Sequence, residues 1–196
     1  MSTFREKFIG AFDLVFFFGR GIKPFEKEGT KKAALESLRI QAWLYPLAPF
    51  FAYFYPPQGM HEKDHPYIQV FLTVTALYIG GIAMNAVVGW LFAIFMDQRD
   101  RFWRFFQASN WVALPAAIMG TPFIALAAFG SMPRAESDRM LLFLSCYMAL
   151  VTACIAFRAF KINWQLAGFV ACMSVFATQQ AWNIVYLVQG LPLVWR

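Results

Sequence analysis

Residues 67–96 read YIQVFLTVTALYIGGIAMNAVVGWLFAIFM, a run of mostly apolar and small residues that contains no Asp, Glu, Lys or Arg. A helix needs about 20 apolar residues to cross the ~30 Å hydrocarbon layer of a bilayer. Because an α-helix rises about 1.5 Å per residue, this run exceeds one crossing, and we expect it to tilt or to project beyond the bilayer. The stretch predicts a membrane protein built from helices.

Similar charge-free runs recur along the chain, which has 196 residues, 60% of them hydrophobic and 14% charged. Soluble domains carry nearer ~25% charged residues, so a soluble enzyme, a collagen-like chain and a disulfide scaffold are excluded. The runs are continuously apolar rather than alternating, which argues against a β-barrel. They predict five spans, at Leu38–Tyr55, Tyr67–Met96, Trp111–Phe129, Met140–Phe157 and Leu166–Val188.

The predicted fold is an all-α, polytopic membrane helix bundle of five transmembrane helices preceded by an N-terminal amphipathic helix. Residues 1–37 would form a cytoplasmic interfacial segment, residues 38–188 the transmembrane domain, and residues 189–196 a short external tail. The first span contains two prolines, so we expect either a kinked crossing or a re-entrant segment. The third span also contains two prolines and should be bent.

The basic residues are distributed unevenly between the two sides of the predicted membrane. Of the 17 Lys and Arg residues, 13 fall before the first span, counting Arg39 at its start, or in the second and fourth loops. The positive-inside rule therefore predicts a multi-pass protein with a cytoplasmic N-terminus and an external C-terminus. This spread of charge suits anionic lipid headgroups, and the chain has no nucleic-acid-binding motif.

The N-terminal segment has the pattern of an amphipathic helix. Phe4, Phe8 and Phe12 recur at helical spacing, and Thr3 with Glu6 makes a T-x-x-E capping box. Two interpretations stay open: the Phe face lies in the membrane interface, or it packs on the transmembrane bundle or another subunit. The residues expected to contact lipid or a partner are Phe4, Phe8, Phe12, Lys31, Lys32, Arg99, Arg101 and Arg104.

Small and amide residues mark the expected helix contacts inside the membrane. Gly81, Asn85 and Gly89 follow one another at spacing four, which lets helices approach closely. Pro115 in the third span and Asn183 in the fifth are further packing candidates. The alternatives to internal packing are a polar ligand cavity and an interface to another subunit.

The string His61-Glu62-Lys63-Asp64-His65 matches the H-E-x-x-H motif of zinc proteases. That motif needs a helix to place both histidines on one face, and Pro66 disfavours helical backbone at His65. We expect a solvated turn, with zinc catalysis by His61, Glu62 and His65, or adventitious metal binding, as alternatives. No cofactor and no catalytic residue are predicted.

The run from Phe102 to Phe106, followed by Ser109-Asn110-Trp111-Val112-Ala113-Leu114-Pro115, resembles the Yip-domain family of five-helix membrane proteins. In that family a Phe-rich basic cytoplasmic loop leads into a third helix that carries a proline, and the likeness covers roughly residues 38–188. Eukaryotic members interact with small Rab-type GTPases and shape or sort membranes. Their acidic Asp-Leu-Tyr-Gly-Pro stretch is missing here, so the resemblance implies a bacterial-type relative, and a bacterial inner or plasma membrane is the expected location.

The leading hypothesis is a non-enzymatic membrane scaffold or accessory subunit whose basic cytoplasmic face contacts lipid headgroups or partner proteins, with a membrane protein or a second copy as partner. The alternative is a carrier or chaperone of an apolar or lipid-like ligand, held between the third span and the amides of the fifth. A zinc-dependent membrane hydrolase that uses the HEKDH string is third.

Overall fold

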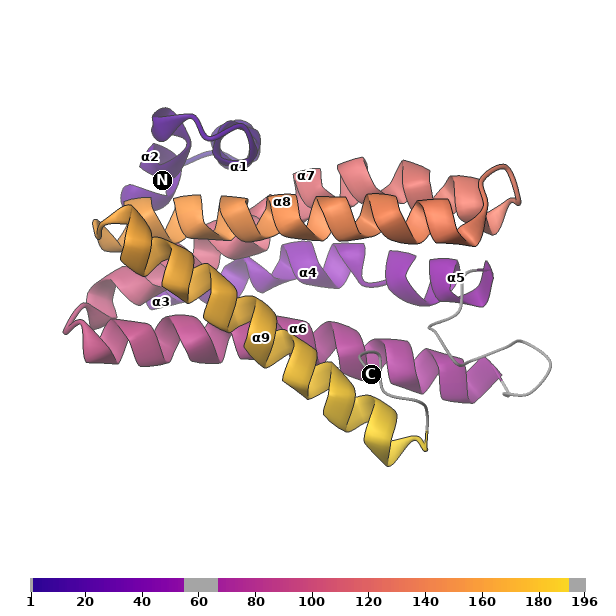
Figure 1. Ribbon diagram of the computed structural model, residues 1–196. Coiled ribbons are helices and arrows are strands. Elements are labelled where there is room, and N and C mark those ends of the chain that lie inside the picture. The colour runs from indigo at the N-terminus through magenta and orange to yellow at the C-terminus, as the bar shows by residue number, and fades with distance from the viewer. Residues whose placement is uncertain (1, 55–66, 191–196) are drawn as a thin grey trace.

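The computed structural model describes residues 2–54 and 67–190, and these residues form helices and turns without any strand (Figure 1). The predicted all-α fold is therefore confirmed. Its long helices are α6 (Tyr67–Phe95), α7 (Arg99–Ala128), α8 (Arg134–Phe160) and α9 (Trp164–Val188). Three of them, α6, α7 and α8, are long and apolar enough to cross a membrane.

The bounds of α6 match the predicted second span, whereas α7 and α8 extend well beyond the predicted third and fourth spans. Helix α7 begins at Arg99 rather than at Trp111, and α8 begins at Arg134 rather than at Met140. The reason is that a charged residue marks the edge of an apolar run but is compatible with helical backbone. Helix α7 also continues through Pro115 and Pro122, each of which removes only one backbone hydrogen bond.

The predicted first span, Leu38–Tyr55, is not a single helix. It is divided into α4 (Leu38–Leu44) and α5 (Leu47–Phe54), with Tyr45 and Pro46 between them. Pro46 has no N–H and its ring crowds the carbonyl one turn earlier, which ends the regular hydrogen-bond pattern. Each piece is about two turns long, so neither alone can span ~30 Å of hydrocarbon.

Residues 2–37 fold as an N-terminal unit of four short elements: α1 (Phe4–Val15), η1 (Gly19–Ile22), α2 (Lys23–Glu26) and α3 (Lys31–Glu36). The predicted capping box is confirmed, because the Glu6 N–H donates to Thr3 Oγ1 over 3.3 Å and the Thr3 N–H donates to Glu6 Oε2 over 2.8 Å. Helix α1 ends where Phe17 adopts a left-handed φ of 62° and the Phe18 N–H donates to the Asp13 carbonyl.

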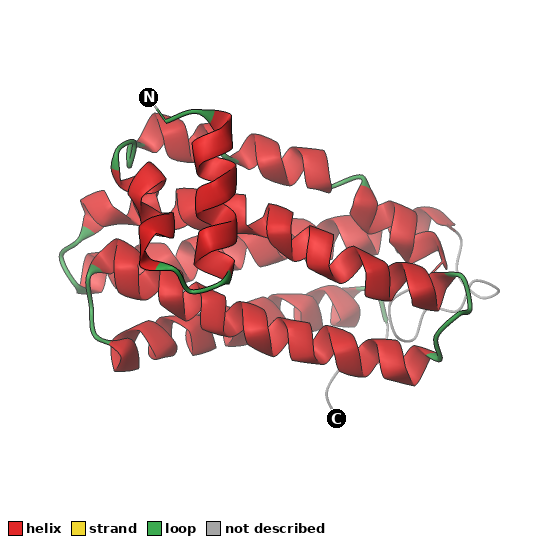
Figure 2. Ribbon diagram, turned by 90° about the horizontal axis from the view of Figure 1, so that it is seen from above, coloured by secondary structure: helices red, strands yellow, loops and turns green. Residues whose placement is uncertain are grey.

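The basic segments gather at one end of the bundle. The α6–α7 and α8–α9 turns lie at the same end, and the N-terminal unit sits close to it (Figure 1). Helix α1 crosses α7 and α8, since it is seen end-on in Figure 1 and runs up the page in Figure 2 while the long helices run across both views. The α7–α8 turn lies at the opposite end, where two basic and two acidic residues at the start of α8 balance in charge: Arg134, Glu136, Asp138 and Arg139.

Candidate functional site

The small residues of α6 contact two different helices rather than one. A Cβ added at Gly89 would lie 2.5 Å from Phe105 Cε1 on α7, whereas one added at Gly81 would lie 3.7 Å from Thr178 Cγ2 on α9. Asn85 lies half-buried between them. Pro115 is fully buried, and Asn183 Oδ1 accepts a hydrogen bond of 3.5 Å from Gln179 within α9. The predicted stripe is therefore shared between an α6–α7 contact and an α6–α9 contact.

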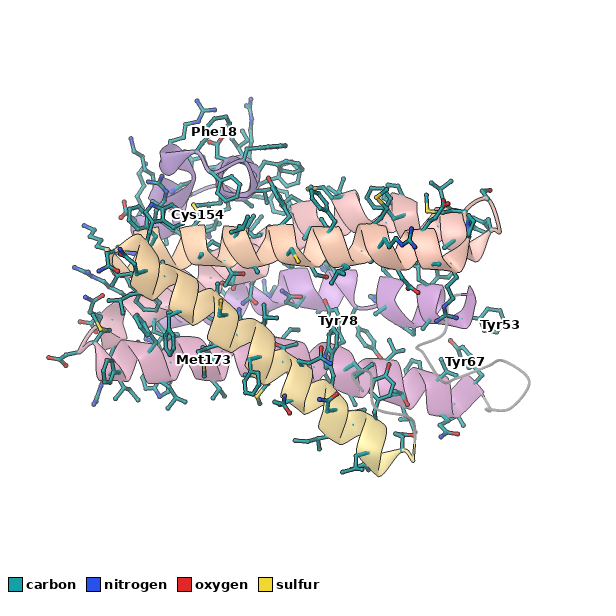
Figure 3. The ribbon with its side chains drawn as sticks, viewed as in Figure 1. Phe18, Tyr53, Tyr67, Tyr78, Cys154 and Met173 are labelled. Carbon is teal, nitrogen blue, oxygen red and sulfur yellow. The ribbon has the colours of Figure 1, made fainter. Side chains whose placement is uncertain are left out.

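A hydrogen-bonded network joins α4, α6 and α7 at the point where the three helices meet. The Tyr78 hydroxyl donates to the Gln41 carbonyl at 2.9 Å and lies 2.8 Å from Gln41 Oε1, and Figure 3 shows Tyr78 reaching from α6 toward α4. Gln41 Nε2 donates to Asn110 Oδ1 over 3.4 Å, and Asn110 Nδ2 donates to Ser37 Oγ over 2.9 Å. The network satisfies amides that would otherwise be costly to bury.

Beside this network lies a groove of about 550 Å³ between α4–α5, α6, α7 and the start of α8. Its α7 wall is built from small side chains, which leave the space that larger ones would fill. Polar groups occur near the network and at the α8 end. The groove is lined by Gln41, Leu44, Leu47, Ala48, Phe51, Ala52, Val74, Tyr78, Ala113, Ala116, Ala117, Gly120, Thr121, Ile124, Arg134, Asp138 and Leu141.

This groove coincides only in part with the ligand site that the carrier hypothesis expects. The sequence placed an apolar ligand between the third span and the amides of the fifth. The groove does border α7, but the residues that line it come from α4 to α8 and none comes from α9. Helices α4 and α5, on the two sides of Pro46, supply the lining residues that α9 does not.

The N-terminal unit is packed on the bundle through the apolar face of α1. Ala11, Leu14 and Val15 are fully buried in the same core as residues of α7 and α8, and the Tyr147 hydroxyl of α8 donates to the Val15 carbonyl over 2.6 Å. Phe8 packs half-buried against this core, while Phe4 is 54% exposed with its ring 5.1 Å from that of Trp111. The packing of Phe8 supports the interpretation that the Phe face packs on the bundle, and the exposure of Phe4 leaves room for the interpretation that it contacts the membrane interface.

Inside the N-terminal unit, α1 and η1 approach at two glycines. A Cβ on Gly21 would lie 2.6 Å from the Gly10 carbonyl oxygen, closer than any side chain allows. The Arg20 guanidinium bonds both carboxylate oxygens of Asp13, over 2.8 and 3.1 Å, and Asp13 raises the pKa of Arg20. These contacts hold the turn after α1 against the helix.

A second ion pair joins α1 to the segment that follows α2 in the N-terminal unit. Lys7 Nζ lies 2.6 Å from Glu28 Oε2, and the Ser2 N–H also donates to Glu28. Burial alone would raise the pKa of Glu28, but the hydrogen bonds from Lys7 and Ser2 and the charge of Lys7 outweigh burial and lower it. Because the folded pKa is lowered, this stabilisation is present at neutral pH and is lost as the pH falls through the folded pKa.

Some of the basic residues predicted to contact lipid or a partner are exposed, and the others bond to groups within the protein. Lys31, Lys32 and Arg99 are exposed, and Lys31 Nζ lies 5.8 Å from the centroid of a Trp103 ring. Arg101 instead donates to the Phe160 carbonyl over 2.7 Å, which caps the end of α8.

Arg104 is also used within the protein, since its Nη1 pairs with Glu26 Oε1 at 3.4 Å. It thereby joins α7 to α2 at the charged end of the bundle. The sequence offered no signal for either internal role, because both partners are distant along the chain.

Three further aromatic residues, just after the end of α1, are exposed but were not among the residues expected to contact lipid. They are Phe16, Phe17 and Phe18, which are 55%, 37% and 53% exposed.

The HEKDH string, with His61, Glu62 and His65, lies outside the described residues. Within residues 2–54 and 67–190, no three His, Cys, Asp or Glu side chains are grouped so that they could hold a metal ion. The cysteines of this part of the chain, Cys146, Cys154 and Cys172, are not joined by disulfides.

No family model, no curated protein and no solved structure matches this chain. The resemblance to Yip-domain proteins accordingly stays a prediction that rests on the quoted residues.

Proposed function

We propose that the chain is a non-enzymatic, five-span membrane scaffold or accessory subunit, a bacterial-type relative of the Yip-domain proteins, with its N-terminus in the cytoplasm. In this proposal α4–α5 and α9 join α6, α7 and α8 as spans. The charged end of the bundle, with the N-terminal unit on it, would face anionic headgroups or a partner protein. The observation that carries the proposal is the orientation of α1 across α7 and α8.

A helix that crosses the spans lies along the membrane plane when the spans cross the bilayer. One face of α1 is occupied by the bundle, whereas Phe16 and Phe18, just after its end, stay about half exposed, with the Arg20 guanidinium carbon 5.5 Å from the centroid of the Phe18 ring. Phe18 stands at the outer edge of the N-terminal unit, away from the bundle (Figure 3). Aromatic side chains favour the membrane interface. Exposed lysines of the same unit, such as Lys31 and Lys32, would each add about 1 kcal/mol of attraction to anionic headgroups.

The depth of residue 18 in a bilayer tests this proposal. A nitroxide label placed at Phe18→Cys in a cysteine-free full-length protein, reconstituted into nanodiscs, is expected to collide more with oxygen than with a water-soluble nickel reagent. The matched control is Lys27→Cys, an exposed position of the same unit, which should collide more with the nickel reagent. Equal access of the nickel reagent to both labels would contradict the proposed contact between Phe18 and lipid.

Topology is tested separately by cysteine labelling in cells. Arg99→Cys on the α6–α7 side should react with a membrane-impermeant maleimide only after permeabilisation, because 13 of 17 basic residues lie on that side. Ser131→Cys, in the exposed α7–α8 turn, should react in intact cells. The reverse pattern would refute the proposed orientation.

The groove beside Tyr78 supports a second candidate function, the binding of one hydrocarbon chain of a membrane lipid. Its lining is mostly aliphatic, and its volume of about 550 Å³ suits a single chain rather than a protein segment. Gln41 and Tyr78 at one part of the groove, and Arg134 and Asp138 at the α8 end, offer polar contacts to a lipid's polar group.

Filling the groove tests this candidate. Ala117→Phe places a ring in the groove and should lower the lipid that co-purifies with the protein about tenfold, equivalent to ~1.4 kcal/mol. The control is Ala128→Phe, a half-buried residue of α7 that does not line the groove. The measurement is the molar ratio of lipid to protein by native mass spectrometry, and equal ratios for both variants would contradict lipid binding in the groove.

A further inference from the structure

A second, basic pocket lies at the charged end of the bundle, where the end of α8 meets the N-terminal unit. It has a volume of about 360 Å³ and is lined by Ile22, Glu26, Phe157, Arg158, Lys161 and Ile162. Arg158 and Lys161 come from α8 and the turn after it, while Ile22 and Glu26 come from η1 and α2. The pocket therefore exists only when the N-terminal unit is docked.

The charge of this pocket is positive. Glu26 is its one acidic lining residue and is already paired with Arg104 at 3.4 Å. No carboxylate of the described residues pairs with Arg158 or Lys161, and the buried Nε of Arg158 has no hydrogen-bond partner among them. A guanidinium without a carboxylate partner favours an anion beside it.

Two backbone features lie next to the basic residues of the pocket. The Arg158 guanidinium lies against Gly19 so closely that a Cβ at this glycine would be 2.8 Å from Nη1. Lys161 has a left-handed φ of 55° at the end of α8, which turns the chain toward α9. Arg158 and Lys161 line the pocket together with the apolar side chains of Ile22 and Ile162.

The aromatic residues beside the pocket suit the level of lipid headgroups. Phe157 lines the pocket and stacks on Trp164 with centroids 4.7 Å apart and ring planes at 11°. Trp164 is 49% exposed at the start of α9. An exposed Trp next to basic residues at the end of an apolar helix is typical of the interface between hydrocarbon and headgroups.

We infer that this pocket binds the phosphate of an anionic phospholipid, with Arg158 and Lys161 donating to its oxygens and the apolar walls contacting the glycerol and first methylenes. Two cations and an apolar wall suit a phosphodiester at a membrane surface better than a free ion. The inference rests on the proposed function, because it identifies one headgroup site within the charged face.

The test measures binding of phosphatidylglycerol and phosphatidylcholine to the full-length protein in a neutral detergent by native mass spectrometry. The wild type should prefer phosphatidylglycerol. Lys161→Asn removes the charge while Asn tolerates the left-handed backbone, and it should weaken phosphatidylglycerol binding about tenfold. Lys27→Asn, at an exposed lysine that lies outside the pocket and is expected to face water, is the matched control and should leave binding unchanged.

A charge-neutral variant separates the pocket from general surface charge. Gly19→Ala alters no charge but would push the Arg158 guanidinium away, so it should also weaken phosphatidylglycerol binding. If Lys27→Asn weakens binding as much as Lys161→Asn, or if Gly19→Ala has no effect, the pocket is not the site, although the charged face can still contact headgroups elsewhere. A wild type without lipid preference also overturns the site, and the label at residue 18 then decides the proposed function independently.

Inorganic phosphate distinguishes a headgroup from a soluble ligand. At millimolar concentration it should leave bound phosphatidylglycerol in place, because the lipid also contacts the apolar walls. Complete displacement by phosphate would overturn the assignment to a lipid and identify a soluble phosphate as the ligand.

Discussion

Gly89→Ala is expected to destabilise the protein by ~1–3 kcal/mol, the usual cost of overpacking a filled core. The added Cβ would lie 2.5 Å from Cε1 and 2.8 Å from Cδ1 of Phe105. Phe105 is fully buried and stacks on Phe160 with ring centroids 5.2 Å apart, so it has no space into which to turn. The measurement is the thermal unfolding midpoint of the purified protein in detergent, followed by tryptophan fluorescence.

The matched control is Gly81→Ala, two turns earlier on the same helix. There the new Cβ would lie 3.7 Å from Thr178 Cγ2, an ordinary van der Waals contact. Replacing a helical glycine by alanine also gains roughly 0.5–1 kcal/mol, so the midpoint should stay the same or rise. Equal losses in both variants would mean that α6 does not approach α7 more closely than α9.

Gly21→Ala is expected to loosen the N-terminal unit, at a cost of about 1–3 kcal/mol. Its Cβ would lie 2.6 Å from the Gly10 carbonyl oxygen and 2.7 Å from the Leu14 nitrogen. Both are backbone atoms, which cannot move aside unless η1 separates from α1. Limited trypsin digestion should therefore cleave after Arg20 faster in the variant than in the wild type.

Gly29→Ala is the control for this experiment, because its Cβ would lie 3.4 Å from the Phe25 carbonyl oxygen, a contact that the turn can accept. Its digestion rate should match that of the wild type. If Gly21→Ala is cleaved no faster, the close contact of the two glycines does not hold the unit together.

Separation of the N-terminal unit from the bundle would also open the pocket at Arg158. The Gly21→Ala variant should therefore bind less phosphatidylglycerol than the wild type.

Local sequence determined the features that depend on neighbouring residues. The charge-free run at residues 67–96 predicted α6 because backbone hydrogen bonds inside hydrocarbon must be satisfied within the helix itself. Thr3 and Glu6 predicted the start of α1, since both capping bonds join residues three apart. Pro46 similarly predicted an irregular first span, because the missing N–H is a property of that residue alone.

The tertiary structure decided what depends on residues far apart in the chain. Arg101 and Arg104 read as free surface charges in the sequence, but packing places Phe160 and Glu26 beside them and uses both internally. Gly81 and Gly89 share one sequence pattern, yet different neighbours give them different tolerance for a methyl group. Hydropathy and spacing describe one helix at a time, whereas a groove or a pocket is formed by the side chains of several helices, so only their packing could place Arg158 and Lys161 beside Ile22.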